Sequence, residues 1–222
     1  MRVKICCISS VDEARMAVEA GAAALGLVSH MPSGPGVIEE ALIAEIAARV
    51  PPPVATFLLT SLQDPDAIVA QQRRCRTNTI QLCDSLPEGG YARLRRALPG
   101  IALVQVVHVR GEASLDEARA AAPHVDALLL DSGNPSLAVK ELGGTGRVHD
   151  WDVSRRIRDT AGVPVFLAGG LRDDNVADAV RRVAPFGLDL CSGVRTDGRL
   201  DPYKLRRFFA HLSGLAPAPS RA

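Results

Sequence analysis

The feature that most constrains the fold of this chain is an alternation of short apolar runs with amphipathic stretches, repeated eight times along 222 residues. The apolar runs predict strands at residues 2–6, 24–28, 54–59, 79–82, 102–107, 126–130, 164–167 and 187–191. The amphipathic stretches predict helices at residues 11–20, 38–49, 64–75, 88–98, 114–121, 151–160, 173–184 and 201–212. Because a parallel pair of strands needs a long crossover, usually a helix, this order indicates a parallel sheet.

Eight strand–helix units fit a single (β/α)8 TIM barrel, a fold of about 250 residues that can be as short as about 200. The alternative is an open doubly wound sheet, whose first strand–helix turn normally carries a glycine-rich dinucleotide loop. The corresponding turn here, residues 6–10, reads Cys-Cys-Ile-Ser-Ser and contains no glycine. We therefore predict one α/β barrel domain over residues 1–213, with residues 214–222 as a disordered tail rich in Pro, Ala and Ser.

Charge and hydropathy exclude several classes of partner. The net charge is +1, and the charged residues are spread along the chain, so no basic stripe for nucleic acid is expected. No run approaches the ~20 apolar residues of a membrane helix, and the N-terminus lacks the features of a signal peptide. We expect a cytoplasmic protein, monomeric or homodimeric, that does not bind nucleic acid or membranes.

The chain has five cysteines, at positions 6, 7, 75, 83 and 191. Their odd number and irregular spacing argue against a disulfide framework and against a zinc ribbon, so reduced thiols are expected and no metal site is predicted. Four of them nevertheless fall near predicted strand ends, which leaves a metal or redox cluster at one mouth of the fold as an alternative.

Cys6 is a candidate catalytic base because it ends the first predicted strand, and in a barrel the loops after the strand ends form the active face. Side-chain alternation places Lys4 on the same side of the strand, one pleat below Cys6. A nearby cation favours the thiolate, the form that accepts a proton. The alternative is that Cys6 is a small buried hydrophobe, as free cysteines often are.

Asp131 is the matching candidate acid, since it follows the apolar run Ala127–Leu130. A carboxyl group there is costly unless it is paired or exposed at the mouth, and partial burial would let it carry a proton for general acid catalysis. The alternative is that it caps the following turn. A thiolate that removes a proton from carbon, opposite an acid that protonates oxygen, is suited to sugar isomerisation.

Small-residue turns follow the last three predicted strands and point to a phosphorylated small-molecule substrate. Glycine lets backbone N–H groups approach a ligand, and the loops after strands seven and eight are the usual phosphate site of barrels. Alternatively, each glycine only provides the positive φ of a tight turn. The predicted substrate- and phosphate-binding residues are Lys4, Gln81, Gly143, Gly144, Gly169, Gly170, Ser192 and Gly193.

With these motifs in order, the chain resembles the phosphoribosylanthranilate isomerase family of tryptophan biosynthesis almost from end to end. The resemblance is carried by Lys4-Ile5-Cys6, Glu19-Ala20-Gly21-Ala22 with Leu25-Gly26, Gln81-Leu82, Leu130-Asp131-Ser132, Gly143-Gly144-Thr145-Gly146 with Asp150-Trp151, Leu167-Ala168-Gly169-Gly170-Leu171 with Asn175-Val176, and Ser192-Gly193-Val194. It implies a TIM barrel that performs an Amadori rearrangement without a cofactor. It also implies that Cys6 is the general base, that Asp131 is the general acid, and that the phosphate lies against Gly144, Gly170, Ser192 and Gly193.

The chain departs from the family pattern in the residues of recognition. The family has Ser-Pro-Arg after strand two, and its arginine recognises the anthranilate carboxylate, whereas residues 33–36 here read Ser-Gly-Pro-Gly. The family's Gln-Leu-His-Gly has become Gln-Leu-Cys-Asp, so that Asp84 would repel an anionic aromatic acid if it faces the site. Arg110 or Arg195 is a possible replacement for the arginine. Two alternatives therefore stay open: an isomerase for a different sugar phosphate, or a non-catalytic barrel that binds a phosphate ligand or a metal.

Overall fold

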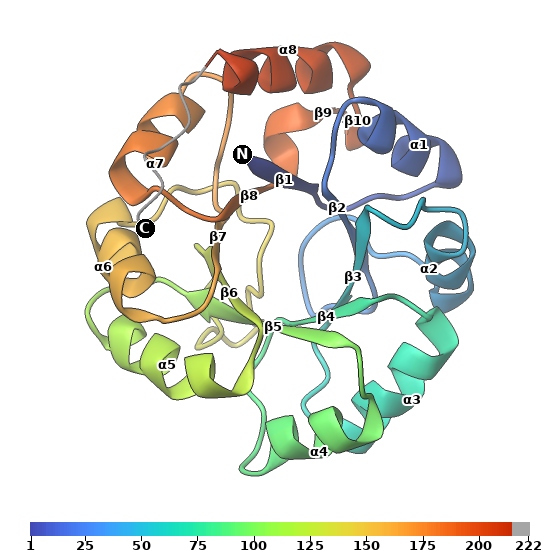
Figure 1. The fold of residues 1–222 in the computed structure, drawn as a ribbon, viewed down its shortest axis with the longest axis vertical. Coiled ribbons are helices and arrows are strands. Elements are labelled where there is room, and N and C mark those ends of the chain that lie inside the picture. The colour runs from blue at the N-terminus through green and yellow to red at the C-terminus, as the bar shows by residue number, and fades with distance from the viewer. Residues whose placement is uncertain (215–222) are drawn as a thin grey trace.

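The structure is a computed structural model that describes residues 1–214, and it shows eight parallel strands closed into a barrel in the order β1 to β8 (Figure 1). The strands are β1 (Arg2–Ile5), β2 (Ala24–Val28), β3 (Ala55–Thr60), β4 (Thr79–Leu82), β5 (Ala102–His108), β6 (Ala127–Asp131), β7 (Val165–Leu167) and β8 (Gly187–Leu190). The ring of helices outside is α1 (Val11–Glu19), α2 (Glu40–Ala47), α3 (Pro65–Cys75), α4 (Gly90–Ala97), α5 (Ala113–Ala121), α6 (Trp151–Thr160), α7 (Val176–Val183) and α8 (Pro202–Ser213). The predicted TIM barrel is confirmed. Of the predicted disordered tail, residues 214–222, only Gly214 is described, as the C-cap of α8, and residues 215–222 lie outside the described part.

Alternation along each strand sorts the apolar residues into two layers. On β1, Val3 and Ile5 belong to the large core between sheet and helices, whereas Cys6, just past the strand, belongs to a smaller core inside the barrel. The inner core includes Phe57 and Phe166, whose rings meet edge to face with centroids 6.1 Å apart. The barrel is therefore a packed solid rather than a pore, and space for a ligand exists only where this packing stops.

The helix starts follow the capping rules that the sequence suggested. The carboxylates of Asp64, Asp150 and Asp201 each accept hydrogen bonds from the first backbone N–H groups of α3, α6 and α8. Helix α7 begins at Val176 rather than at residue 173, because the Asn175 side chain accepts from the N–H of Arg172 and holds a turn before the helix. The boundary predicted there was three residues too early.

Three short elements after the last strand and the fifth helix were not predicted. They are the 3₁₀ helices η1 (Ala122–His124) and η2 (Ser192–Val194), and a hairpin of β9 (Arg195–Thr196) and β10 (Arg199–Leu200). Each is only two or three residues long, so hydrophobic periodicity cannot reveal it. The hairpin turns at Asp197 and Gly198, both of which have positive φ.

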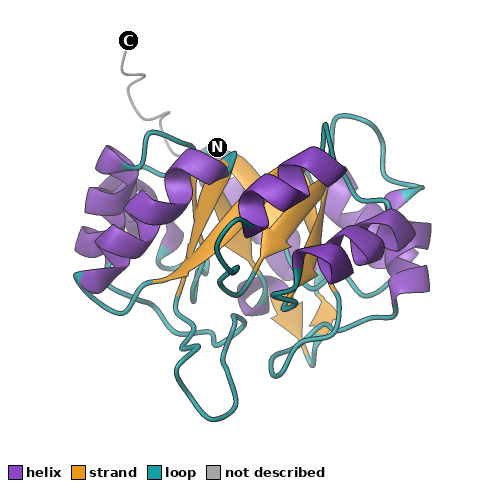
Figure 2. Cartoon of the chain, turned by 90° about the horizontal axis from the view of Figure 1, so that it is seen from below, coloured by secondary structure: helices purple, strands orange, loops and turns teal. Residues whose placement is uncertain are grey.

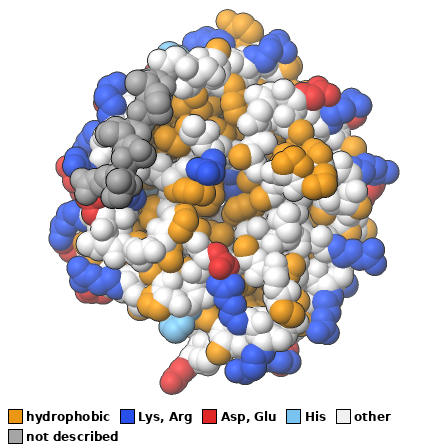
Figure 3. Space-filling model, in the orientation of Figure 1, with side chains coloured by type: hydrophobic (Ala, Val, Ile, Leu, Met, Phe, Trp, Pro, Cys, Tyr) orange, Lys and Arg blue, Asp and Glu red, His pale blue; other side chains and the backbone are white. Residues whose placement is uncertain are grey.

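The two ends of the barrel differ in their loops. Figure 2 shows the N-terminus on one side and the longest loops on the opposite side. Figure 3 shows the face turned to the viewer in Figure 1, where apolar side chains gather near the centre and charged side chains at the rim. Every predicted catalytic residue follows a strand end and lies at the side of the long loops. Within residues 1–214, no helix combines the length and the apolar character that crossing a membrane requires.

Candidate active site

A hollow opens at the carboxyl ends of the strands, and both predicted catalytic residues line it. Cys6 and Asp131 come from opposite sides of the barrel, after β1 and at the end of β6, and each keeps a small exposed fraction, 7% and 8%. Six of the eight predicted binding residues line the same hollow: Gln81, Gly143, Gly144, Gly169, Gly170 and Ser192. The structure therefore brings the thiol, the carboxyl group and the glycine turns into one place.

Lys4 lies beneath the hollow and does not line its wall, so the expectation that it contacts the substrate is corrected. Its side chain is fully buried, and its ammonium donates to Oδ2 of Asp189 at 2.8 Å. Burial alone would lower the pKa of Lys4, but the carboxylate of Asp189 and the thiol of Cys6 raise it above its usual value. Lys4 is therefore a fixed positive charge on the inner side of Cys6.

Gly26 on β2 leaves space for the side chains of Cys6 and Lys4. A Cβ added at Gly26 would lie 2.8 Å from Sγ of Cys6 and 3.0 Å from Nζ of Lys4. Both distances are below ordinary van der Waals contact, so any larger residue here would displace the sulfur or the ammonium. The glycine at position 26 is therefore explained by the space that the sulfur of Cys6 and the ammonium of Lys4 occupy beside it.

The two carboxylate oxygens of Asp131 lie in different surroundings. Its Oδ1 accepts from the N–H of Ser132 at 2.7 Å, which fixes the turn after β6. Its Oδ2 faces Gly143, where an added Cβ would lie 2.8 Å from that oxygen. One carboxylate oxygen therefore holds the backbone, and the other faces the loop that closes the hollow.

The glycine turns allow neighbouring backbone segments to approach one another closely. Gly169 and Gly170 both have positive φ, at 81° and 61°, and a Cβ at Gly170 would lie 2.8 Å from the carbonyl oxygen of Gly146. Gly193 does not line the hollow, contrary to expectation, because it packs on the backbone of Leu171, whose carbonyl oxygen would be 2.1 Å from an added Cβ. The N–H groups of Ser192 and Gly193 donate to no acceptor within residues 1–214.

Three further cysteines surround Cys6. Cys7 and Cys191 line the hollow with their sulfur atoms 2.8 Å apart, and Cys83 lines it from β4's end. The contact with Cys191, together with burial, raises the pKa of Cys7, whereas the contact with Cys7 and the charge of Arg195 lower the pKa of Cys191. Within residues 1–214, no three His, Cys, Asp or Glu side chains are grouped so that they could hold a metal ion.

Asp189 is a functional candidate that the sequence reasoning missed. It lines the floor of the hollow, and its Oδ1 has no hydrogen-bond partner among the described residues. Burial raises its pKa against the opposing effect of Lys4. A signal was present, because an acidic residue inside the apolar strand 187–191 is costly without a partner. Its pairing with Lys4 depends on the register of β1 with β8, which joins these two residues.

Arg195 cannot replace the family's arginine, because it is buried and already bound. Its guanidinium pairs with Glu13 at 3.1 Å and donates to the carbonyl oxygens of Cys6 and Cys7. Burial opposes the ionisation of Glu13, but hydrogen bonds from Arg195 and from the N–H of Leu200 lower its pKa below the usual value. This pair fastens the turn after β1 to the hairpin after β8.

Arg110 also lies outside the wall of the hollow. It donates to Oγ of Ser136 at 2.7 Å and pairs with Glu117, beside a second hollow between α4 and α5. Asp84 lines that second hollow too, and its carboxylate is paired with Lys140, so the predicted repulsion of an anionic substrate does not arise from a free charge.

Comparison with known proteins gives one consistent result. Residues 3–211 match the family model described as N-(5'-phosphoribosyl)anthranilate (PRA) isomerase. Among proteins of that name, those of Methanosarcina mazei and Halorubrum lacusprofundi are 34% and 38% identical, and the matches cover 94% and 95% of this chain and 92% and 95% of theirs. The crystal structure of the phosphoribosyl anthranilate isomerase from Thermotoga maritima superposes with a TM-score of 0.80 at 28% identity, over 97% of this chain and 100% of that one.

A second solved structure shows a ligand. It is a phosphoribosyl anthranilate isomerase in complex with reduced 1-(o-carboxyphenylamino)-1-deoxyribulose 5-phosphate, with a TM-score of 0.78 and 26% identity. That match covers 97% of this chain and 100% of the other. The same barrel, in a protein of that name, therefore holds a carboxyphenylamino sugar phosphate.

Proposed function

The chain belongs to the N-(5'-phosphoribosyl)anthranilate isomerase family, and on that premise we propose that Cys6 and Asp131 carry out the family's Amadori rearrangement as base and acid. The enzyme is an isomerase of tryptophan biosynthesis, and its substrate is a phosphorylated small molecule. The observation that carries the assignment of roles is that the thiol of Cys6 and the carboxyl group of Asp131 line one hollow from opposite sides.

The proposed reaction is a ring opening followed by an isomerisation, and each step is assisted by a proton transfer. Asp131 protonates the ring oxygen of the ribose, so that the C1–O bond breaks and a protonated Schiff base forms at C1. Cys6 then removes the proton from C2, and the electron pair moves to give an enolamine. Protonation at C1 with loss of the proton from the C2 hydroxyl yields the 1-deoxyketose. General acid–base catalysis of this kind contributes roughly 10²–10⁴-fold for each group.

The surroundings of the two groups support these roles. The buried ammonium of Lys4 lies beside the sulfur of Cys6, a position in which a cation favours a thiolate, and Asp189 keeps that ammonium in place. The N–H group of Ser192 and the turn at Gly170, which both line the hollow, are suited to a phosphate, because the N–H of Ser192 has no acceptor among the described residues.

The test is to measure kcat for Cys6→Ser and Asp131→Asn with synthetic N-(5'-phosphoribosyl)anthranilate. Each variant is expected to lose roughly 10²–10⁴-fold in kcat, and the wild type in deuterated water is expected to place deuterium at C1 of the product. Cys75→Ala is the matched control, since Cys75 is buried away from the hollow. Activity of the Cys6 variant equal to that of the control would refute the assignment of the base.

The oligomeric state follows as a separate proposal. A monomer or a homodimer of the 23.5 kDa chain is expected, and light scattering on a sizing column distinguishes the two. A mass above that of two chains would refute it.

A further inference from the structure

The wall of the hollow contains no positive charge that could meet the carboxylate of the substrate. Within residues 1–214, neither lysine nor arginine lines the hollow that holds Cys6 and Asp131. Residues 33–36, which follow β2 and cover one side of it, read Ser-Gly-Pro-Gly. Backbone donors can hold a phosphate, but an aminobenzoate carboxylate buried beside them needs a partner of its own.

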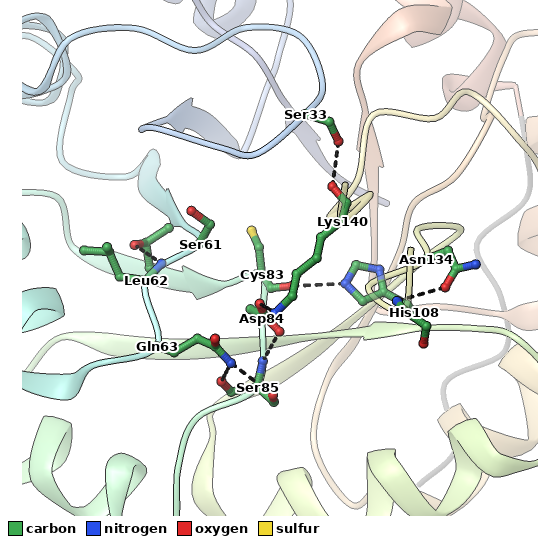
Figure 4. Close-up of polar contacts among 12 residues, drawn as sticks. Ser33, Ser61, Leu62, Gln63, Cys83, Asp84, Ser85, His108, Asn134 and Lys140 are labelled. Atoms are coloured by element: carbon green, nitrogen blue, oxygen red, sulfur yellow. Dashed lines mark hydrogen bonds and ion pairs between the residues drawn. The ribbon is translucent and has the colours of Figure 1, made fainter. Parts of the chain in front are cut away.

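Lys140 is a cation that lies next to residues 33–36. It lies on the long loop between β6 and α6, where its carbonyl oxygen accepts from Oγ of Ser33 at 2.7 Å. Its ammonium donates to Oδ2 of Asp84 at 2.5 Å. Figure 4 shows the side chain running from beside Ser33, past Cys83, to Asp84. Ser33 and Cys83 both line the hollow, so Lys140 is bonded to one wall residue and paired with the chain neighbour of another.

The available volume also points toward Lys140. The hollow around Cys6 is narrow, with a volume of about 70 Å³. The second hollow encloses about 500 Å³, and Cys83 belongs to the walls of both. Tyr91, His108 and Lys140 line this larger space. Cys83 thus lies between the two hollows, and its neighbour Asp84 lines the second one together with Lys140.

We propose that Lys140 determines specificity by binding the carboxylate of the substrate's aromatic ring, an inference that rests on the proposed function. Asp84 holds the ammonium in place while the site is empty, and it remains the counter-ion when the carboxylate arrives. The side chain of Lys140 is 39% exposed, so its head can reach a ligand without unfolding the loop. Arg195 is buried on Glu13 and Arg110 is bound to Ser136. Arg147, on the same loop as Lys140, is paired with Glu141.

The test uses ligands that do not react. The first is the reduced product analogue, 1-(o-carboxyphenylamino)-1-deoxyribitol 5-phosphate, and the second is the same compound without the carboxylate. Calorimetry gives Kd for the wild type, Lys140→Met and Lys140→Arg. The methionine variant keeps the length of the stem but removes the charge. It is expected to bind the carboxylate-bearing analogue roughly 10- to 100-fold more weakly and the other analogue within about twofold. The arginine variant is expected to restore most of the affinity.

Arg110→Met is the matched control, because Arg110 lines the same second hollow and has the same exposed fraction as Lys140. Equal affinities of Lys140→Met and the wild type for the carboxylate-bearing analogue would overturn the inference. So would a loss of affinity for both analogues alike, or a loss in the Arg110 variant instead. Failure of the proposed function is distinguishable, since the wild type would then turn over no N-(5'-phosphoribosyl)anthranilate, whatever the Lys140 variants bind.

Discussion

The buried pair of Lys4 and Asp189 gives a prediction whose size follows from its surroundings. The ammonium is fully buried, the carboxylate is 7% exposed, and the two atoms are 2.8 Å apart. Asp189→Asn removes the negative charge and leaves the ammonium without a counter-ion inside the barrel. Breaking a buried pair in this way costs about 3–5 kcal/mol, a large part of the ~5–15 kcal/mol that stabilises a typical domain.

The assay is urea unfolding followed by far-ultraviolet circular dichroism. With a slope of about 2 kcal/mol per molar urea, the midpoint of Asp189→Asn is expected to fall by roughly 2 M. Lys4→Met combined with Asp189→Leu replaces both charges with apolar groups, and it is expected to recover most of the loss, because desolvation of the two charges offsets much of their attraction. A loss below about 1 kcal/mol in the single variant, or a double variant as unstable as the single one, would refute this reasoning.

Three further results are expected. Gly26→Ala is expected to lower the free energy of unfolding by about 1–3 kcal/mol, since its methyl group would collide with the sulfur of Cys6; an unchanged urea midpoint would contradict this. Glu13 has a lowered pKa, so its contribution to stability is present above the unfolded-state value of 4.5 and is lost as the pH falls through the lower folded-state value. The stability of Glu13→Gln should therefore decline less between pH 5 and 3 than that of the wild type, as measured by urea titrations at each pH; parallel declines would be evidence against the pairing. In time-resolved alkylation with iodoacetamide, read by peptide mass spectrometry, Cys191 should react before Cys75, because the contact with a neighbouring thiol lowers the pKa of Cys191 whereas burial raises that of Cys75 to about 12; the reverse order would disprove this account.

The barrel was predictable from the sequence because the hydrophobic patterns that specify its strands and helices are local and repeated. Each apolar run and each amphipathic stretch carries its own periodicity, and the eight strands lie within two residues of the predicted ranges. The placement of Cys6 and Asp131 at one hollow was predictable for the same reason, since residues at strand ends share one rim. The role of Lys4 as a buried ion-pair partner was not, because it depends on which residue of the last strand lies beside the first.

The geometry of the loops could not be predicted from hydrophobic periodicity. The pairing of Lys140 with Asp84 joins residues 56 positions apart, and it depends on the path of a long loop that has no periodicity. Arg195 was predicted as a possible replacement for the family's arginine. Its bound state was not predicted, because the hairpin that positions it has strands of only two residues, which hydrophobic periodicity does not reveal. In both cases the charge was visible in the sequence, but its partner was set by segments that periodicity does not describe.

The bond between Glu13 and Arg195 has a consequence for how the protein is made. Arg195 also binds the carbonyl oxygens of Cys6 and Cys7, so the backbone of the turn after β1 is held by a residue almost two hundred positions later in the chain. A ribosome releases the N-terminal segment long before Arg195 exists. Nascent chains therefore lack the side chain that holds this turn until the segment after β8 has emerged, and so do fragments from interrupted translation.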